Sequence, residues 1–231
     1  MFGPRIDTFP QTALVNGQIG HDGMPDRAVT TASNDPTVLM HIHQPGVNLA
    51  IWHRALPPTL HGPSLRALMA AAPFTAVAIG TAEALPDQLS AQLPVPAPID
   101  LLLDLADLAA VFTVLDKGPP RVRIRLEALT HDGCKKWHAD AVGLRLLCTY
   151  HGPGTQWLSM DGGAPAARAM DAPPSAAAIG QLPPGAVAVL KGERYPNNLG
   201  NGCIHRSPPA GPGRRARLLL CIDQTEWNLD E

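Results

Sequence analysis

The spacing of apolar residues along the chain changes near residue 120. Before that point, apolar residues recur at intervals of three and four over 64–72 and 99–115, the spacing of amphipathic helices. After it, charged and apolar residues alternate over 121–129, the period-2 pattern of a strand with one face in the core. The pattern therefore predicts a helical first half and a β-rich second half.

Short apolar runs separated by Pro- and Gly-rich turns continue this β pattern to the end of the chain. Further strands are expected at 136–140, 144–150, 155–158, 186–190, 202–205 and 217–222. The segment 75–79 reads as either a strand or a linker, and 164–179 has room for a turn or two of helix. We expect a β-sandwich or jelly roll in this half.

The first 37 residues contain prolines that interrupt any period, so they predict an irregular arm. Two short apolar runs, 38–43 and 47–52, flank a Gln-Pro-Gly turn and predict a hairpin. We expect one α+β domain over 1–231: the arm at 1–37, a mainly helical support with this hairpin at 38–120, and the β core at 121–231.

Composition narrows the class of protein. Proline (25) and glycine (21) make up about a fifth of the 231 residues, against roughly 12% in average proteins, which fits a loop-rich β protein. Lys plus Arg (18) nearly balances Asp plus Glu (20), so we expect no nucleic-acid partner. No apolar run has the length of a membrane span, and the four cysteines form no Cys-x-x-Cys pair. We expect a cytoplasmic protein with reduced thiols and no membrane partner.

The sequence Trp137-His138-Ala139-Asp140 carries the strongest chemical signal. In a strand, residues two apart share one face with Cα atoms about 6.7 Å apart, so His138 and Asp140 can reach one ion. His205, in another expected strand, offers a third ligand. Two histidines and one carboxylate leave half of an octahedral shell open, an arrangement that suits non-haem Fe(II).

The order of motifs around this triplet resembles the Fe(II)- and 2-oxoglutarate-dependent oxygenases, particularly their prolyl-hydroxylase-like branch. After His-x-Asp comes a strand ending in Thr149-Tyr150, a Gly-Thr turn, a Pro-Pro-Gly strand, His205 and basic residues some ten positions later. The resemblance implies a double-stranded β-helix (jelly-roll or cupin-like) core, with N-terminal helices packed on it.

The same resemblance implies roles for individual residues. His138, Asp140 and His205 would hold the metal, and Arg217 or Arg215 would pair with the far carboxylate of 2-oxoglutarate. A guanidinium suits two-pronged carboxylate binding.

Further cosubstrate contacts are expected from the strand before the Gly-Thr turn. Thr149 and Tyr150 would lend hydroxyls, although adjacent strand residues point to opposite faces, so we expect at most one in the pocket. Arg145 lies four residues before Thr149, so the two share one face of the expected strand, and Arg145 is a further candidate anion contact.

A second resemblance is more specific. Leu190-Lys-Gly-Glu-Arg-Tyr-Pro196 and Ile204-His-Arg-Ser-Pro208, together with the His-x-Asp segment, resemble a bacterial family of unknown function, Domain of Unknown Function 1826. The family implies no substrate. Its genes lie beside zinc-responsive genes and metal-chaperone GTPases, which implies zinc as an alternative metal.

Three functions remain open at this stage. The first is an oxygenase that uses Fe(II) and 2-oxoglutarate on an unknown small-molecule or peptide substrate. The second is a non-catalytic zinc protein for storage, delivery or sensing, in which Cys203 or Cys134 adds a thiolate. The third is a zinc hydrolase with Glu193 as the nearest candidate base.

Another possible ligand pair is His41 and His43, which have no evident downstream partner. The oligomeric state is open.

Overall fold

The computed structural model describes residues 29–131, 133–159, 163–209 and 216–225. Its helical elements are the short 3₁₀ helices η1 (Pro36–His43), η2 (Pro58–His61) and η3 (Ala176–Ala178) and the α-helices α1 (Pro63–Ala70), α2 (Leu85–Ser90), α3 (Ile99–Asp116) and α4 (Gly163–Arg168). Its strands are β1 (Val29–Ser33), β2 (Val47–Trp52), β3 (Phe74–Gly80), β4 (Val122–Leu129), β5 (Leu144–His151), β6 (Gln156–Leu158), β7 (Ile179–Gln181), β8 (Val187–Lys191), β9 (His205–Arg206) and β10 (Arg217–Gln224). None of the helices in these ranges has the length and hydrophobicity needed to cross a bilayer.

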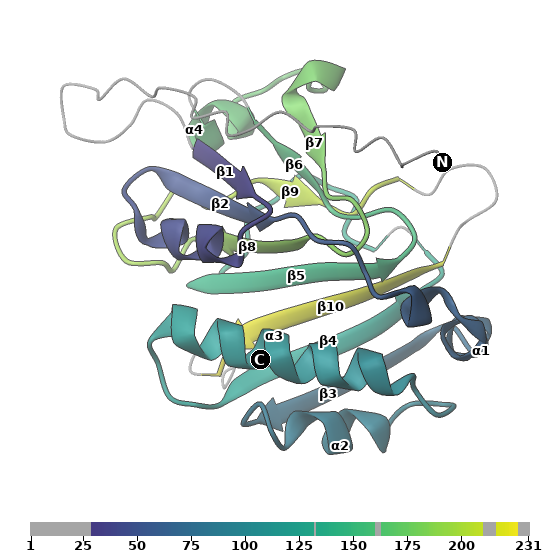
Figure 1. The fold of residues 1–231 in the computed structure, drawn as a ribbon. Helices are drawn as coiled ribbons and strands as arrows, with labels where there is room; N and C mark the ends of the chain where they lie inside the picture. Colours follow the sequence, from purple (N-terminus) through teal and green to yellow (C-terminus); the bar gives the residue numbers. More distant parts are fainter. Residues whose placement is uncertain (1–28, 132, 160–162, 210–215, 226–231) are drawn as a thin grey trace, which may run out of the picture.

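The strands form two sheets (Figure 1). The large sheet has the order β1-β2-β8-β5-β10-β4-β3, and its pairs are antiparallel except for β1 with β2. The small sheet has the order β7-β6-β9. From β4 onward the chain passes back and forth between the two sheets, so the architecture is α+β with a large β-sheet and is consistent with a jelly roll.

Each face of the large sheet has its own apolar core. On one face, Leu101, Leu105 and Phe112 of α3 pack with alternate residues of the strands, such as Leu220 of β10. Figure 1 shows α3 lying across that face. On the other face, Leu147 and Leu219 of the large sheet join Cys203 and Trp157 of the small-sheet side. Because both faces are covered, β10 is buried at seven successive positions.

The sequence pattern predicted several of these elements. The helix over 99–115 is confirmed as α3, and the alternating strand over 121–129 is confirmed as β4, whose residues are alternately buried and half-buried. The segment 75–79 is an edge strand, β3.

The N-terminal predictions were partly wrong. Segment 38–43 is not a strand: Asp35 caps it through the Thr37 N–H, Pro36 begins it, and it forms η1. The run 47–52 is a strand, β2, but it pairs with β1 and β8 rather than in a hairpin. Residues 29–33 of the expected arm form β1, and residues 1–28 lie outside the described residues.

Candidate metal centre

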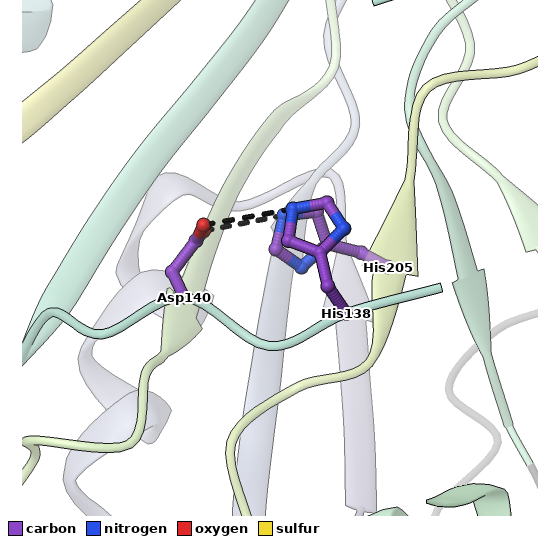
Figure 2. A group of neighbouring side chains, drawn as sticks. All are labelled: His138, Asp140 and His205. Atoms are coloured by element: carbon purple, nitrogen blue, oxygen red, sulfur yellow. Dashed lines mark ion pairs between the residues drawn. The ribbon is translucent and has the colours of Figure 1, made fainter. Parts of the chain in front are cut away.

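His138 and His205 are brought together by the backbone. The N–H of His138 donates to the carbonyl of His205 at 3.1 Å, and the N–H of His205 donates back to the carbonyl of His138 at 2.9 Å. The expected strand at 136–140 is reduced to this single bridge, which continues the small sheet beyond β9. The two rings lie with their centroids 4.6 Å apart. Figure 2 shows both rings turned toward Asp140.

Both imidazoles are oriented by a backbone carbonyl. Nδ1 of His138 lies 2.8 Å from the carbonyl of Lys136, and Nδ1 of His205 lies 3.0 Å from the carbonyl of Cys203. A carbonyl can only accept, so each Nδ1 carries the proton and each Nε2 keeps its lone pair. This is the arrangement that outer contacts impose on metal-binding histidines.

The carboxylate of Asp140 faces both free ring nitrogens. Oδ2 lies 3.2 Å from Nε2 of His205, and Oδ1 lies 3.7 Å from Nε2 of His138. Burial alone would raise the pKa of Asp140, but its neighbours His205, Arg145 and His138 outweigh burial and lower the pKa below its ordinary range. Asp140 is therefore a carboxylate at neutral pH.

These three side chains fit one metal ion. Their ligand atoms all lie within 4.8 Å of one another, and they form a His/Asp cluster of metal-binding type among the described residues. Metal bonds of about 2.1 Å place neighbouring octahedral ligands about 3 Å apart, close to the separation of Asp140 and His205. Oδ2 of Asp140 is buried and accepts no well-aligned hydrogen bond from the described part of the chain. A cation would satisfy this oxygen and both lone pairs.

Arg145 points into the space between the sheets, but it does not present a free guanidinium. Its Nη1 lies 2.7 Å from Oδ1 of Asp140, and its Nε and Nη2 donate to the two oxygens of Asp223 at 2.6 and 2.8 Å. Two carboxylates already pair with this side chain, and the cosubstrate anion contact expected at Arg145 stays a prediction. The sequence analysis missed Asp223. It could have been found as the one acidic residue in the apolar run that follows Arg217, on the same face of the strand as Arg217.

Thr149 and Tyr150 point to opposite faces of β5, as strand geometry requires. Thr149 is buried and shares the face of Leu147, which packs between the sheets. Tyr150 instead points to the helical side, where its hydroxyl donates to Oδ2 of Asp104 on α3 at 2.5 Å. Burial raises the pKa of Tyr150 well above its ordinary value. Of the two, only Thr149 lies on the same side of the sheet as the metal cluster.

Arg217 is the first residue of β10. Its side chain lies on the same face of the strand as Leu219 and Cys221, which pack between the two sheets. It is only 3% exposed, yet none of its three guanidinium nitrogens finds a hydrogen-bond partner among the described residues. Burial lowers the pKa of Arg217 to about 10, while the charge of Glu127 acts in the opposite direction. The group is still a cation at neutral pH, and burying such a charge without a hydrogen-bonding acceptor is costly.

Gly152, in the turn after β5, adopts a φ of 79°, and a Cβ there would lie 3.0 Å from Cγ of Arg217. Glycine thus lets the backbone pass against this side chain. Arg215, the other candidate for the cosubstrate carboxylate, lies outside the described residues.

The other candidate ligands lie apart from the cluster. Cys203 packs in the apolar core between the sheets, where burial, with the Asp140 charge, raises the pKa of its thiol to about 12. Cys134 is exposed, and neither thiol belongs to the described cluster. His41 and His43 lie on η1, where Nδ1 of His43 is 3.1 Å from the Tyr195 hydroxyl.

Glu193 is engaged elsewhere. Its carboxylate accepts from the N–H groups of Gly200 and Gly202, at 2.6 and 2.9 Å, and pairs with Arg168. These contacts brace the loop before His205. They leave the carboxylate without the freedom expected of a hydrolytic base, which was the role considered for it.

Solved structures resemble the fold at low identity. The dioxygenase for auxin oxidation 1 from Arabidopsis thaliana, in a binary complex with 2-oxoglutarate, is 11% identical, with 84% of this chain and 91% of that chain covered and a TM-score of 0.46. A bsmA homolog from Methylobium petroleophilum is 14% identical over 82% and 92% of the two chains, with a TM-score of 0.45. AviO1 from Streptomyces viridochromogenes is 16% identical over 85% and 98%, with a TM-score of 0.42.

Likeness at this level carries no argument about activity. The chain matches no curated protein. A family model does match, over residues 33–223, a range that takes in the small sheet, the large sheet apart from β1, α3 and the His/Asp cluster. This match confirms the resemblance drawn from the motifs around Lys191 and His205. The chain belongs to the family described as Protein of unknown function (DUF1826).

Proposed function

We propose that this chain is a non-haem Fe(II)- and 2-oxoglutarate-dependent oxygenase built on a double-stranded β-helix. The order of strands supports this fold. From β4 to β10 the chain alternates between the sheets, so that β8, β5, β10 and β4 form one wall, while the His138 bridge, β9, β6 and β7 form the other. The metal cluster lies on the strands of the small wall.

His138, Asp140 and His205 would hold Fe(II) through two Nε2 atoms and one carboxylate oxygen. Bound Fe(II) would supply the activation of dioxygen, coupled to decarboxylation of 2-oxoglutarate to succinate. The chain itself prepares each ligand: two carbonyls accept from the Nδ1 atoms, so Nε2 of each ring is left for the metal, and the neighbours of Asp140 lower its pKa. Three protein ligands leave positions open for small molecules.

The buried guanidinium of Arg217 is the observation that carries the proposal. A cation sealed between two sheets with no partner in the described structure is costly unless a ligand supplies an anion. A dicarboxylate that binds the metal at one end would present its other carboxylate to such a group, and a planar guanidinium can bind it through two hydrogen bonds. We assign Thr149, buried on the same face and in the cross-strand position of Leu219, as a hydroxyl donor beside it.

The alternative of a zinc-storage or zinc-sensing protein receives less support. The described cluster contains no thiol, and three ligands do not complete the closed four-ligand shell of a structural zinc site. Such a role would also leave the buried charge of Arg217 without a purpose. All four cysteines are free, which fits our proposal that the protein works in the cytoplasm.

The test is formation of succinate from 2-oxoglutarate by Fe(II)-loaded protein in air. The wild type should produce succinate slowly even without a substrate, because decarboxylation needs only the cosubstrate and dioxygen. Asp140→Ala should produce none above the rate of free Fe(II). Protein that retains iron and folds normally, yet forms no succinate, would contradict the proposal.

A further inference from the structure

We infer that Arg145 and Asp223 act as a positioning pair that restricts Asp140 to binding the metal through a single oxygen. The inference rests on the proposed metal site and assigns Arg145 a role other than cosubstrate binding. It concerns neither of the two histidines and no group of the cosubstrate.

The two oxygens of the Asp140 carboxylate have different neighbours. Oδ1 lies 2.7 Å from Nη1 of Arg145 and 3.7 Å from Nε2 of His138, so its closest neighbour is the guanidinium. Oδ2 lies 3.2 Å from Nε2 of His205 and lacks a well-aligned donor. In this orientation Oδ2 is the oxygen that is free to bind a cation, while Oδ1 is held by the guanidinium.

The guanidinium is itself held rigidly. Asp223 is the cross-strand partner of Arg145 in the β5–β10 ladder, and it accepts two parallel hydrogen bonds from Nε and Nη2. Asp223 is 1% exposed and also accepts a weaker contact from the thiol of Cys221 at 3.6 Å. This pair of hydrogen bonds between neighbouring strands of the large sheet fixes the direction of Nη1 of Arg145. Nη1 in turn fixes the rotation of the Asp140 carboxylate.

This arrangement has a consequence for the open coordination positions. A carboxylate that is free to turn can bind a metal through both oxygens and occupy one more position. With Oδ1 bonded to Arg145, Asp140 occupies one position, and the metal keeps more room for other ligands.

The charge of the guanidinium does not by itself oppose the metal, because Asp223 offsets it within the pair. The effect is therefore geometric, and it is best tested by variants that keep the charge balance.

The central experiment measures the affinity of the metal-free protein for Co(II) alone, by calorimetry and by the visible d–d spectrum. The test variant is Arg145→Gln/Asp223→Asn, which removes one positive and one negative charge. The matched control is Arg125→Gln/Glu127→Gln, which removes the ion pair between Nε and Oε2 at 3.2 Å on the same face of the large sheet, away from Asp140.

We expect the test variant to bind Co(II) about 10 to 100 times more weakly than wild type, with a changed spectrum, as for losses of other contacts that orient metal ligands. The control should match wild type within about twofold. Equal affinity and an unchanged spectrum in the test variant would overturn the inference while leaving the metal site intact. A wild type that binds no Co(II) would overturn the metal site and the inference together.

A second variant covers the case in which the double variant does not fold. Arg145→Lys keeps the charge, but an ammonium cannot form the parallel pair of bonds with Asp223 while also reaching Asp140. We expect an intermediate Co(II) affinity and a thermal stability of the metal-free protein closer to wild type. Wild-type affinity and spectrum in Arg145→Lys would contradict the requirement for a fork-shaped group.

Discussion

His138 and His205 lie far apart in the sequence, yet they face each other through a reciprocal pair of backbone hydrogen bonds. This bridge places the two residues opposite each other, and their rings, each oriented by a backbone carbonyl, lie with centroids 4.6 Å apart. The β-fold thus brings the two histidines together through the backbone, and their side chains are not needed for that pairing.

The first prediction follows from this division. His205→Ala leaves both backbone bonds possible, so the melting temperature of the metal-free protein should fall by only a few degrees, while binding of Fe(II) or Co(II) should drop at least 100-fold. Metal content after dialysis measures the effect. His61→Ala, an exposed histidine on η2, serves as the control and should retain the metal. A variant of His205 that binds metal like wild type would remove His205 from the site.

Replacing Arg217 should stabilise the protein and impair its function. Burial lowers the pKa of Arg217 to about 10, well below the ordinary value of a guanidinium, so the folded state carries this charge at a cost of about 3 kcal/mol at pH 7. Arg217→Met should raise the free energy of unfolding by about 1–3 kcal/mol in urea denaturation.

The same variant separates binding from stability. Added 2-oxoglutarate should raise the melting temperature of metal-loaded wild type and should have little effect on Arg217→Met, because a ligand stabilises only a state that binds it. A destabilised Arg217→Met that still responds to 2-oxoglutarate would contradict the assignment of Arg217.

Asp104 of α3 should be important for stability alone. Its carboxylate pairs with both terminal nitrogens of Arg54 and accepts the Tyr150 hydroxyl, on the face of the large sheet opposite the metal cluster. Asp104→Ala leaves the largely buried Arg54 cation unpaired and should cost about 3 kcal/mol in unfolding free energy. Asp107→Ala, an exposed acid of the same helix, should stay within about 0.5 kcal/mol of wild type. A comparable loss in both variants would indicate a helix effect instead.

The burial of Lys191 should make the stability of the protein depend on pH. Burial lowers the pKa of Lys191 to about 8 from an ordinary 10.5, so between these values the unfolded chain holds more protons than the folded one. Stability therefore rises with pH through this window. The difference in unfolding free energy between wild type and Lys191→Met should grow in favour of wild type by about 2 kcal/mol from pH 7.5 to 9.5. A difference that is constant over this range would show that Lys191 does not titrate as expected.

The His/Asp cluster was predictable because it depends on short-range spacing and on order along the chain. His138 and Asp140 are two residues apart, and His205 follows in the motif order of a known family. The alternation of side chains along a strand also predicted that Thr149 and Tyr150 would point to opposite faces.

The contacts of Arg145 and the helical conformation of η1 could not be predicted from the alternation of side chains along a strand. Parity placed Arg145 on the inner face, but only the register of β5 against β10 shows that Asp223 lies across from it. Similarly, the apolar residues of 38–43 fit a strand as well as a buried 3₁₀ turn. The Asp35 cap and Pro36 decide between them, and their effect appears once the tertiary contacts are known.

The central claim is that Fe(II) on His138, Asp140 and His205 is joined by 2-oxoglutarate anchored on Arg217. The most direct measurement is the visible absorption spectrum of Fe(II)-loaded protein titrated with 2-oxoglutarate in the absence of oxygen. We expect a weak charge-transfer band that saturates in wild type, is abolished in Asp140→Ala and requires a much higher 2-oxoglutarate concentration in Arg217→Met. Iron-loaded, folded wild-type protein that shows no band at any 2-oxoglutarate concentration would contradict it.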